Sequence, residues 1–192
     1  MEKIKIIDIT QELFSCRVYP GDKQPVYEQV KTIDRDKYNL TNISLSVHSG
    51  THVDAPNHFI ENGEALNELD LSVFYRKCTV VSFEGIIRED NIADILKTCK
   101  KRLLFKGKNE LSRSAAELIA NSHVKLVGVE SQSVGNPEHP LLVHMILLKR
   151  AVIPLEGLDL SSVEPGEYVL SAFPLNMQGV EGSPVRAVLI RK

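Results

Sequence analysis

The chain has 192 residues, of which 43% are hydrophobic and 25% are charged, and its formal net charge is −2. These values are typical of a globular protein that can bury a core without disulfides. The slightly negative charge argues against a nucleic-acid partner, and no hydrophobic run approaches the length of a membrane span, so we expect neither partner.

The first half of the chain predicts short strands separated by turns. Lys5–Thr10 and Val26–Ile33 are predicted strands, and YPGD at Tyr19–Asp22 is a turn in which Asp22 serves the turn rather than the chemistry. In Asn39–Val47 apolar and polar residues alternate with one break. This alternation predicts a half-buried strand.

The second half predicts more strands and a few helices. Asp90–Lys101 is amphipathic and predicts a helix, and Ser114 with Glu117 resembles a capping box before a short helix. The other predicted elements are strands at Cys78–Glu84, Leu103–Phe105, His123–Glu130, Val152–Glu156, Tyr168–Pro174 and Val185–Ile190, and a helix at Pro140–Arg150. Together these elements predict one mixed α/β domain that covers residues 1–192.

The three cysteines, Cys16, Cys78 and Cys99, are scattered and odd in number. This pattern predicts buried free thiols in a reducing compartment. The N-terminal sequence MEKIKIIDIT interrupts its apolar residues with charges, unlike a secretory signal peptide. We therefore expect a cytoplasmic location.

The stretch VHSGTHVDAPNHF, at Val47–Phe59, holds half of the six histidines of the chain. His48, His52 and His58 lie there with Asp54, and a glycine and a proline among them make a helix implausible. A strand that runs into a loop is the expected setting. In such a strand the even-numbered residues 48, 52 and 54 point to one side.

Two imidazoles and a carboxylate that converge in this way match the ligands of zinc, manganese or iron. A divalent ion with an open position lowers the pKa of water towards about 7 and so supplies hydroxide at neutral pH. A neutral imidazole at His58 can act beside the ion as a general base or acid. The cluster therefore predicts a hydrolytic metal site. A structural metal is the alternative, although structural zinc sites usually contain cysteine.

The segment HSGTHVDAPNH resembles the HxGTHxDxPxH motif of the metal-dependent cyclase family, which includes bacterial kynurenine formamidase (arylformamidase) and isatin hydrolase. The resemblance continues in GVESQSV at Gly128–Val134, LEGLDL at Leu155–Leu160 and GSPVRAVL at Gly182–Leu189. It implies a swivelling β/β/α domain with a mixed sheet. It also implies a homodimer or homotetramer that acts on a small molecule.

The resemblance further implies a site with two metal ions, zinc or manganese. His48, His52 and Asp54 would bind one ion, and Asp54 would bridge to a second ion held by His144 and Glu156. His144 lies in the apolar run VHMILL and Glu156 ends the apolar run AVIPLE, so each needs a partner if it is buried. A shared cation would satisfy both side chains.

Two histidines complete this expectation. His139 is the rival of His144 as a ligand, but its spacing from Glu156 differs from that of the family. His58 matches the family histidine that acts as catalytic acid and base. SQS at Ser131–Ser133 follows a predicted strand and is a candidate for the wall of the site.

The implied reaction is hydrolysis of an aryl formamide, with N-formylkynurenine of tryptophan catabolism as the leading substrate. Two alternatives stay open: hydrolysis of a cyclic amide or lactone, as in isatin hydrolase, and metal-dependent binding of a small molecule without turnover. The chain has no tryptophan, and Glu130 stands where the family has an aspartate. These departures concern the substrate more than the metal motif.

Overall fold

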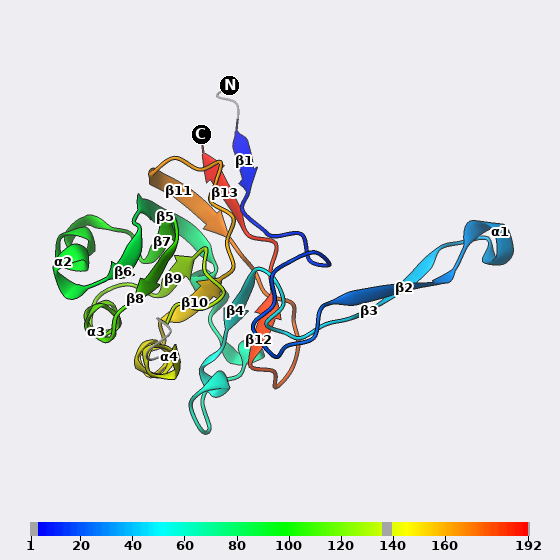
Figure 1. Ribbon diagram of the computed structural model, residues 1–192, viewed down its shortest axis with the longest axis horizontal. Coiled ribbons are helices and arrows are strands. Elements are labelled where there is room, and N and C mark those ends of the chain that lie inside the picture. The colour runs from blue at the N-terminus through cyan, green and yellow to red at the C-terminus, as the bar shows by residue number, and fades with distance from the viewer. Residues whose placement is uncertain (1–3, 136–139, 192) are drawn as a thin grey trace.

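The structure, a computed structural model, describes residues 4–135 and 140–191. A nine-stranded mixed sheet forms its centre (Figure 1). In spatial order its strands are β1 (Lys5–Asp8), β13 (Val188–Arg191), β11 (Gly166–Ser171), β5 (Tyr75–Ser82), β7 (Arg102–Lys106), β9 (Leu126–Val129), β10 (Ile153–Glu156), β4 (His52–Asp54) and β12 (Gly182–Pro184). The strands β5, β7, β9 and β10 are parallel, and the pairs on either side of them are antiparallel. The predicted α/β fold with a mixed sheet is therefore confirmed.

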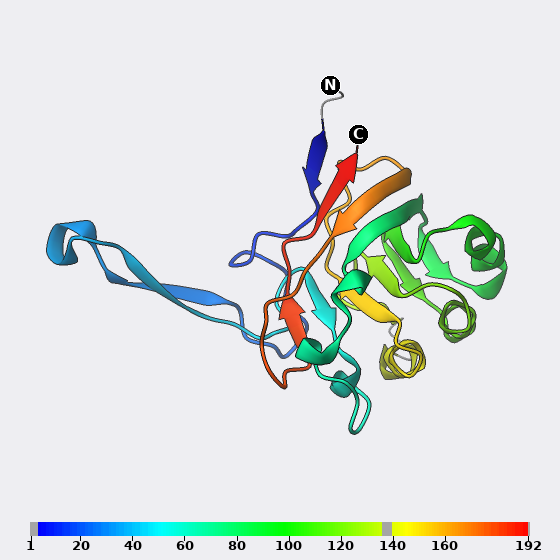
Figure 2. The same ribbon diagram turned by 180° about the vertical axis from the view of Figure 1, so that it is seen from behind.

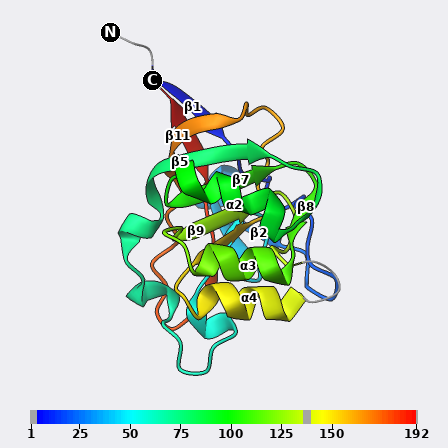
Figure 3. The ribbon, with the colours of Figure 1, turned by 90° about the vertical axis from the view of Figure 1, so that its left-hand side faces the viewer.

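Three helices cover one face of this sheet: α2 (Glu89–Thr98), α3 (Arg113–Ala120) and α4 (Pro140–Leu148) (Figures 1 and 3). The neighbouring strands β7 and β9 are buried on both faces, which is why their sequences, RLLFK and LVGV, are almost continuously apolar. Phe105 packs with the helices, whereas Leu104 points to the opposite face. A short parallel pair, β6 (Gly85–Ile87) with β8 (Asn109–Leu111), adjoins the helical side.

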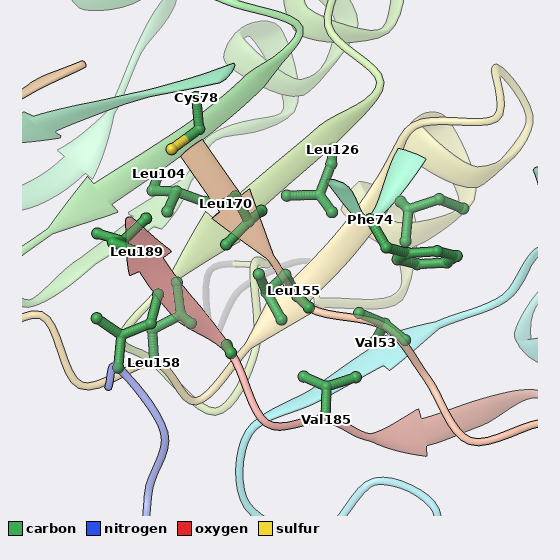
Figure 4. Packing of buried hydrophobic residues seen from close by; sticks show 14 of the residues in the cluster. Val53, Phe74, Cys78, Leu104, Leu126, Leu155, Leu158, Leu170, Val185 and Leu189 are labelled. Carbon is green, nitrogen blue, oxygen red and sulfur yellow. The ribbon is translucent and has the colours of Figure 1, made fainter. Parts of the chain in front are cut away.

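A second apolar core fills the face of the sheet opposite the helices (Figure 4). Val53 of β4 and Leu155 of β10 are fully buried there, beside Leu170 and Leu189. Because successive side chains of a strand alternate between faces, burial of Val53 in this core turns His52 and Asp54 towards the helical face. Packing of one apolar residue thus fixes the direction of two polar ones.

A two-stranded arm projects from the body (Figures 1 and 2). It consists of β2 (Val26–Lys31) and β3 (Leu40–Ser44), with the short helix α1 (Ile33–Asp36) at its tip. The prediction of a half-buried strand at Asn39–Val47 is wrong, because all of β3 is exposed. Alternation predicts that a strand has an apolar face, but it does not predict whether other residues cover that face. In the described chain β3 pairs with β2 alone.

Six large apolar side chains of the arm are exposed: Val26, Tyr27, Ile33, Tyr38, Leu40 and Ile43. An isolated hairpin with an uncovered apolar face is marginally stable in water. The expected homodimer or homotetramer would offer such a face something to pack against. That assembly stays a prediction.

The predicted capping box is also wrong. The N-cap of α3 is Ser112, whose Oγ accepts a hydrogen bond of 3.2 Å from the amide of Ala115, and Ser114 lies inside the helix. Glu117 instead forms an ion pair with Arg113 at 2.8 Å. The helix thus begins two residues earlier than the S-x-x-E pattern predicted, at a serine that has alanine three residues after it.

Sequence periodicity did not predict the shortest elements. The strands β4, β6, β8 and β12 have three residues each, which is too short for a pattern. The same holds for three 3₁₀ turns: η1 (Pro56–His58), η2 (Leu66–Glu68) and η3 (Leu71–Val73). Cys16, Cys78 and Cys99 are buried free thiols, as predicted. In the parts of the chain that the structure describes, no helix has both the length and the apolar character needed to span a bilayer.

Gly128 tests the packing between the sheet and the second core. A Cβ atom there would collide with Leu104 Cδ2 and lie 2.9 Å from Leu158 Cδ1. Gly128→Ala should therefore lower the free energy of unfolding by about 1–3 kcal/mol, as overpacking of a core does. Urea unfolding followed by circular dichroism measures the change, with Lys149→Ala on the surface as the control. Equal stability of Gly128→Ala and wild type would contradict this packing.

Candidate metal centre

Strand β4 places two of the candidate ligands. It lies between β10 and β12, antiparallel to both, and its residue His52 is directly opposite Glu156 of β10. Directly opposed side chains of an antiparallel pair point to the same face. His52 Nε2 accordingly lies 3.3 Å from Glu156 Oε2, and Asp54 Oδ1 lies 3.6 Å from the same nitrogen.

A tight turn before β4 brings His48 back to His52, Asp54 and Glu156. Gly50 in the turn has a φ of +64°, a conformation that a side chain would strain. Gly157, with a φ of +67°, follows β10 and packs so closely that an added Cβ would lie 2.5 Å from the carbonyl oxygen of Gly50. Through this turn His48 Nδ1 comes to 3.0 Å from Asp54 Oδ1.

Helix α4, which lies over this face of the sheet, supplies His144. His144 Nε2 lies 2.9 Å from Glu156 Oε1 and 3.5 Å from Asp54 Oδ2. The backbone amide of Val134 also donates to Glu156 Oε1, at 2.8 Å. The structure thus brings together all five predicted ligands: His48, His52, Asp54, His144 and Glu156. The rival ligand His139 lies outside the described residues.

The cluster is withdrawn from water. Asp54 and Glu156 are only 1% and 3% exposed, and His52 and His144 are 4% and 6% exposed. Two carboxylates at this depth need compensating positive charge. A divalent cation among them would supply it, which is the chemistry that a set of imidazoles and carboxylates is suited to.

Two buried side-chain atoms that could act as metal ligands support the fit to a metal. Asp54 Oδ2 and His48 Nε2 have no hydrogen-bond partner within the described chain, although buried polar atoms nearly always have one. Two groups of residues each offer possible ligand atoms that lie within 4.8 Å of one another. His52, Asp54 and Glu156 form one group, and His48, Asp54 and His58 form the other. The resemblance implied that His48 and His52 share an ion. In the structure His52 lies in one compact group with Glu156 and His48 lies in the other, and Asp54 belongs to both. Because His48 Nδ1 and His52 Nε2 also lie 3.0 and 3.6 Å from the same Asp54 Oδ1, the shared ion stays a prediction.

The pKa values describe the charge of the metal-free cluster. Burial alone would lower the pKa of His52, but its hydrogen bond to Glu156 and the nearby carboxylates outweigh burial and raise the pKa to about 9. Burial likewise opposes ionisation of Glu156, yet hydrogen bonds from His144 and His52 hold its pKa well below its usual range. Without a metal, the cluster is therefore stabilised by imidazolium–carboxylate pairs.

His58 lies beside the cluster in η1. Its ring stacks on that of His48, with centroids 4.2 Å apart, and Phe59 follows it with a ring 4.8 Å from that of His144. Burial lowers the pKa of His58, so this imidazole is neutral at pH 7. Its position suits either the acid–base role expected from the sequence or that of a ligand, because it also belongs to the second group of donor atoms.

A cavity of about 280 Å³ leads from the surface to these residues. His48, His52, His58, His144 and Glu156 contribute to its inner wall. Its other lining residues include Gln132 and Ser133, where the sequence predicted a wall of the site, and Arg17, Tyr19, Asp22 and Leu141, which the sequence did not single out as part of the site. Tyr19 and Asp22 belong to the predicted YPGD turn, and a turn motif by itself does not indicate a pocket; no motif marked Arg17 or Leu141.

Glu130, which departs from the family pattern, has a structural role. Its carboxylate accepts hydrogen bonds from the backbone amides of Gly107, at 2.5 Å, and Leu160, at 2.8 Å. These bonds join the end of β9 to two neighbouring loops. Glu130 does not line the cavity.

The sequence model of the family described as "Putative cyclase" matches residues 7–136. A protein of Salinibacter ruber named kynurenine formamidase is 33% identical over 204 residues, which cover 96% of each chain.

Two solved structures have the same fold. A predicted metal-dependent hydrolase from Bacillus stearothermophilus is 25% identical with a TM-score of 0.86, over 99% of this chain and 100% of that one. Isatin hydrolase A from Labrenzia aggregata superposes with a TM-score of 0.85 at 20% identity, over 97% of this chain and 93% of that one, a likeness that concerns the fold alone. The family match, the relative and the shared fold agree with the histidine motif: the chain belongs to the putative cyclase family.

Proposed function

We propose that this chain is a metal-dependent hydrolase that cleaves an aryl formamide of the N-formylkynurenine type to formate and an aryl amine. The observation that carries the proposal is the pair of donor groups that share Asp54 at the inner end of a cavity, with His58 beside them. The names of the relatives, kynurenine formamidase and metal-dependent hydrolase, support the reaction class.

His52, Asp54, Glu156 and the adjoining His144 would hold one divalent ion, and His48 with Asp54 would hold a second. Zinc and manganese both suit this mixture of imidazole and carboxylate. Such an ion, when bound, polarises a carbonyl oxygen and lowers the pKa of water.

His58 moves the proton in this proposal. As a neutral imidazole it accepts a proton from the water that attacks the formyl carbon. It then donates that proton to the aryl nitrogen as the carbon–nitrogen bond breaks, so that a neutral amine and formic acid leave, and the formic acid loses its remaining proton to water to give formate. Its place between His48 and Phe59, on the wall of the cavity, keeps it within reach of a substrate there.

Gln132 and the apolar wall position the substrate. Gln132 Nε2 is buried and has no hydrogen-bond partner among the described residues, yet its side chain lines the cavity. A rotation of this side chain would let the amide donate to a substrate carbonyl oxygen, which would satisfy it. Phe59 and Leu141 offer apolar surface to an aryl ring. A cavity of about 280 Å³ is small for a ligand site, where about 300–1,000 Å³ is usual, and suits a single ring.

The proposed function is tested by release of kynurenine from N-formylkynurenine. Protein loaded with zinc or with manganese should turn the substrate over, and metal-stripped protein should not. Hydrolysis of isatin or of a lactone, without hydrolysis of the formamide, would move the assignment to the cyclic substrates. Binding of these compounds at a shown metal load without any product would make the chain a binding protein.

Metal binding should expel a proton and strengthen as pH rises. The raised pKa of about 9 keeps His52 protonated at pH 7, and a ligand imidazole must be neutral. Below pH 9 the apparent affinity for zinc should therefore rise about tenfold per pH unit, with release of about one proton from His52 at pH 7. Calorimetric titration of metal-stripped protein in buffers of different ionisation enthalpy measures both quantities. An affinity that does not change between pH 6 and 8 would exclude His52 as a ligand.

His58→Ala should lower kcat by roughly 10²-fold or more and leave the bound metal unchanged, because it removes a proton shuttle and not a ligand. Steady-state kinetics together with metal analysis by mass spectrometry separates the two roles. His123→Ala, which removes an exposed histidine, is the control. Loss of metal in His58→Ala would instead identify His58 as a ligand of the second group.

Gln132→Leu should lower kcat/KM by about 10- to 100-fold, because the substrate carbonyl loses its hydrogen-bond donor. Gln29→Leu on the arm makes the same chemical change away from the cavity and is the control. Unaltered kinetics in Gln132→Leu would show that the amide does not contact the substrate.

A further inference from the structure

Two residues of opposite charge, Arg17 and Asp22, line the cavity from the segment that precedes the arm. Arg17 and Asp22 are both exposed, so they lie towards the entrance of the cavity. The buried cluster forms its inner end. Neither forms an ion pair with the other or with another side chain of the described chain. Two opposite charges that border one cavity without neutralising each other can serve a ligand that carries both signs.

The segment that carries these charges is anchored to the site. Gln11 donates from Nε2 to the carbonyl of Gly157 at 2.7 Å, and its Oε1 accepts a hydrogen bond of 3.2 Å from the amide of Arg17. Gln24 donates to the carbonyls of Phe14 and Cys16, at 3.1 and 3.2 Å. Side-chain bonds therefore hold this loop against the turn that orients the candidate ligands.

The loop between the two charges is also a defined turn. The amide of Asp22 donates to the carbonyl of Tyr19 at 2.9 Å, and Gly21 between them has a φ of +101°. This turn places Asp22 on the same cavity as Arg17, five residues earlier. The sequence predicted that Asp22 serves the turn alone; the cavity gives its carboxylate a second use.

We propose that Arg17 and Asp22 bind the charged end of a zwitterionic substrate: the Arg17 guanidinium binds a carboxylate and the Asp22 carboxylate binds an ammonium group. An amino-acid head group at the entrance then leaves the opposite, aryl end of the molecule at the buried cluster. This inference rests on the proposed function and narrows it to aryl formamides that carry an α-amino acid. Neutral cyclic amides and lactones have no group for either charge.

Three substrates that share the ortho-acyl formanilide core separate the contributions. N-formylkynurenine carries both charges, 4-(2-formamidophenyl)-4-oxobutanoate carries the carboxylate alone, and N-(2-acetylphenyl)formamide carries neither. Metal-loaded wild type should prefer them in that order by kcat/KM.

Arg17→Gln should lower kcat/KM about 10- to 100-fold for both charged substrates, mainly through KM, because a charge-assisted pair is lost. Asp22→Asn should lower it for N-formylkynurenine alone. Each variant therefore reduces the ratio of kcat/KM for N-formylkynurenine over the neutral formamide. Arg113→Gln and Asp94→Asn, exposed on α3 and α2, are the matched controls that should keep the wild-type ratio.

Wild-type selectivity ratios in Arg17→Gln and Asp22→Asn would overturn the inference while the proposed function stands. Failure of metal-loaded wild type to hydrolyse any of the three formamides would overturn the proposed function. In that case calorimetric binding of kynurenine decides: weaker binding by Arg17→Gln than by wild type supports the charged entrance, and equal or absent binding by both overturns it.

Discussion

The structure depends on the burial of two carboxylates, Asp54 and Glu156, within one cluster. Each is almost fully withdrawn from water, and their negative charges lie close enough to share imidazole partners. Such an arrangement is costly unless positive charge is supplied. The imidazole of His52 supplies it by holding a proton, or a divalent cation supplies it by displacing that proton. The charge state of the cluster therefore depends on whether protons or a metal ion neutralise the two carboxylates.

The fold serves this cluster through strand register. The pairing of His52 with Glu156 across β4 and β10 sets one face of polar side chains, and the burial of Val53 and Leu155 on the other face holds it there. A shift of one residue in β4 would bury the histidine in the apolar core and expose the valine to the site. Gly50 and Gly157 allow the two ligand-bearing segments to approach more closely than side chains would permit. Packing and chemistry are thus specified by the same few residues.

Sequence reasoning succeeded where the signal was local. His48, His52, Asp54 and His58 lie in one short motif, so residue types alone marked them as a cluster. Strand alternation explains only His52 and Asp54, because a turn places His48 and η1 places His58. His144 and Glu156 needed the family resemblance, because an apolar neighbourhood shows only that a polar residue requires a partner. The buried core strands were also predictable from local sequence, because burial on both faces leaves continuous apolar runs.

Prediction from sequence failed where the structure depends on contacts between residues that are far apart in the sequence. The alternation in β3 was real, but no pattern within the strand tells whether a core lies beneath it. The entrance of the cavity is built from a loop near Arg17, helix α4 and the segment at Gln132, and their meeting is a property of the sheet order. The spacing of Ser114 and Glu117 matched a capping box, but the hydrogen bond from the Ala115 amide shows that the cap is Ser112.

The wide separation of the ligands along the chain has a consequence for biosynthesis. Asp54 and His144 are 90 residues apart (144 − 54), and β12, which pairs with β4, ends at Pro184. At a translation rate of about 5–20 residues per second, His144 is added about 5–18 s after Asp54. During that interval the nascent chain carries three of the five candidate ligands without the other two. A metal ion that needs the full ligand set would therefore bind only after most of the polypeptide has been made.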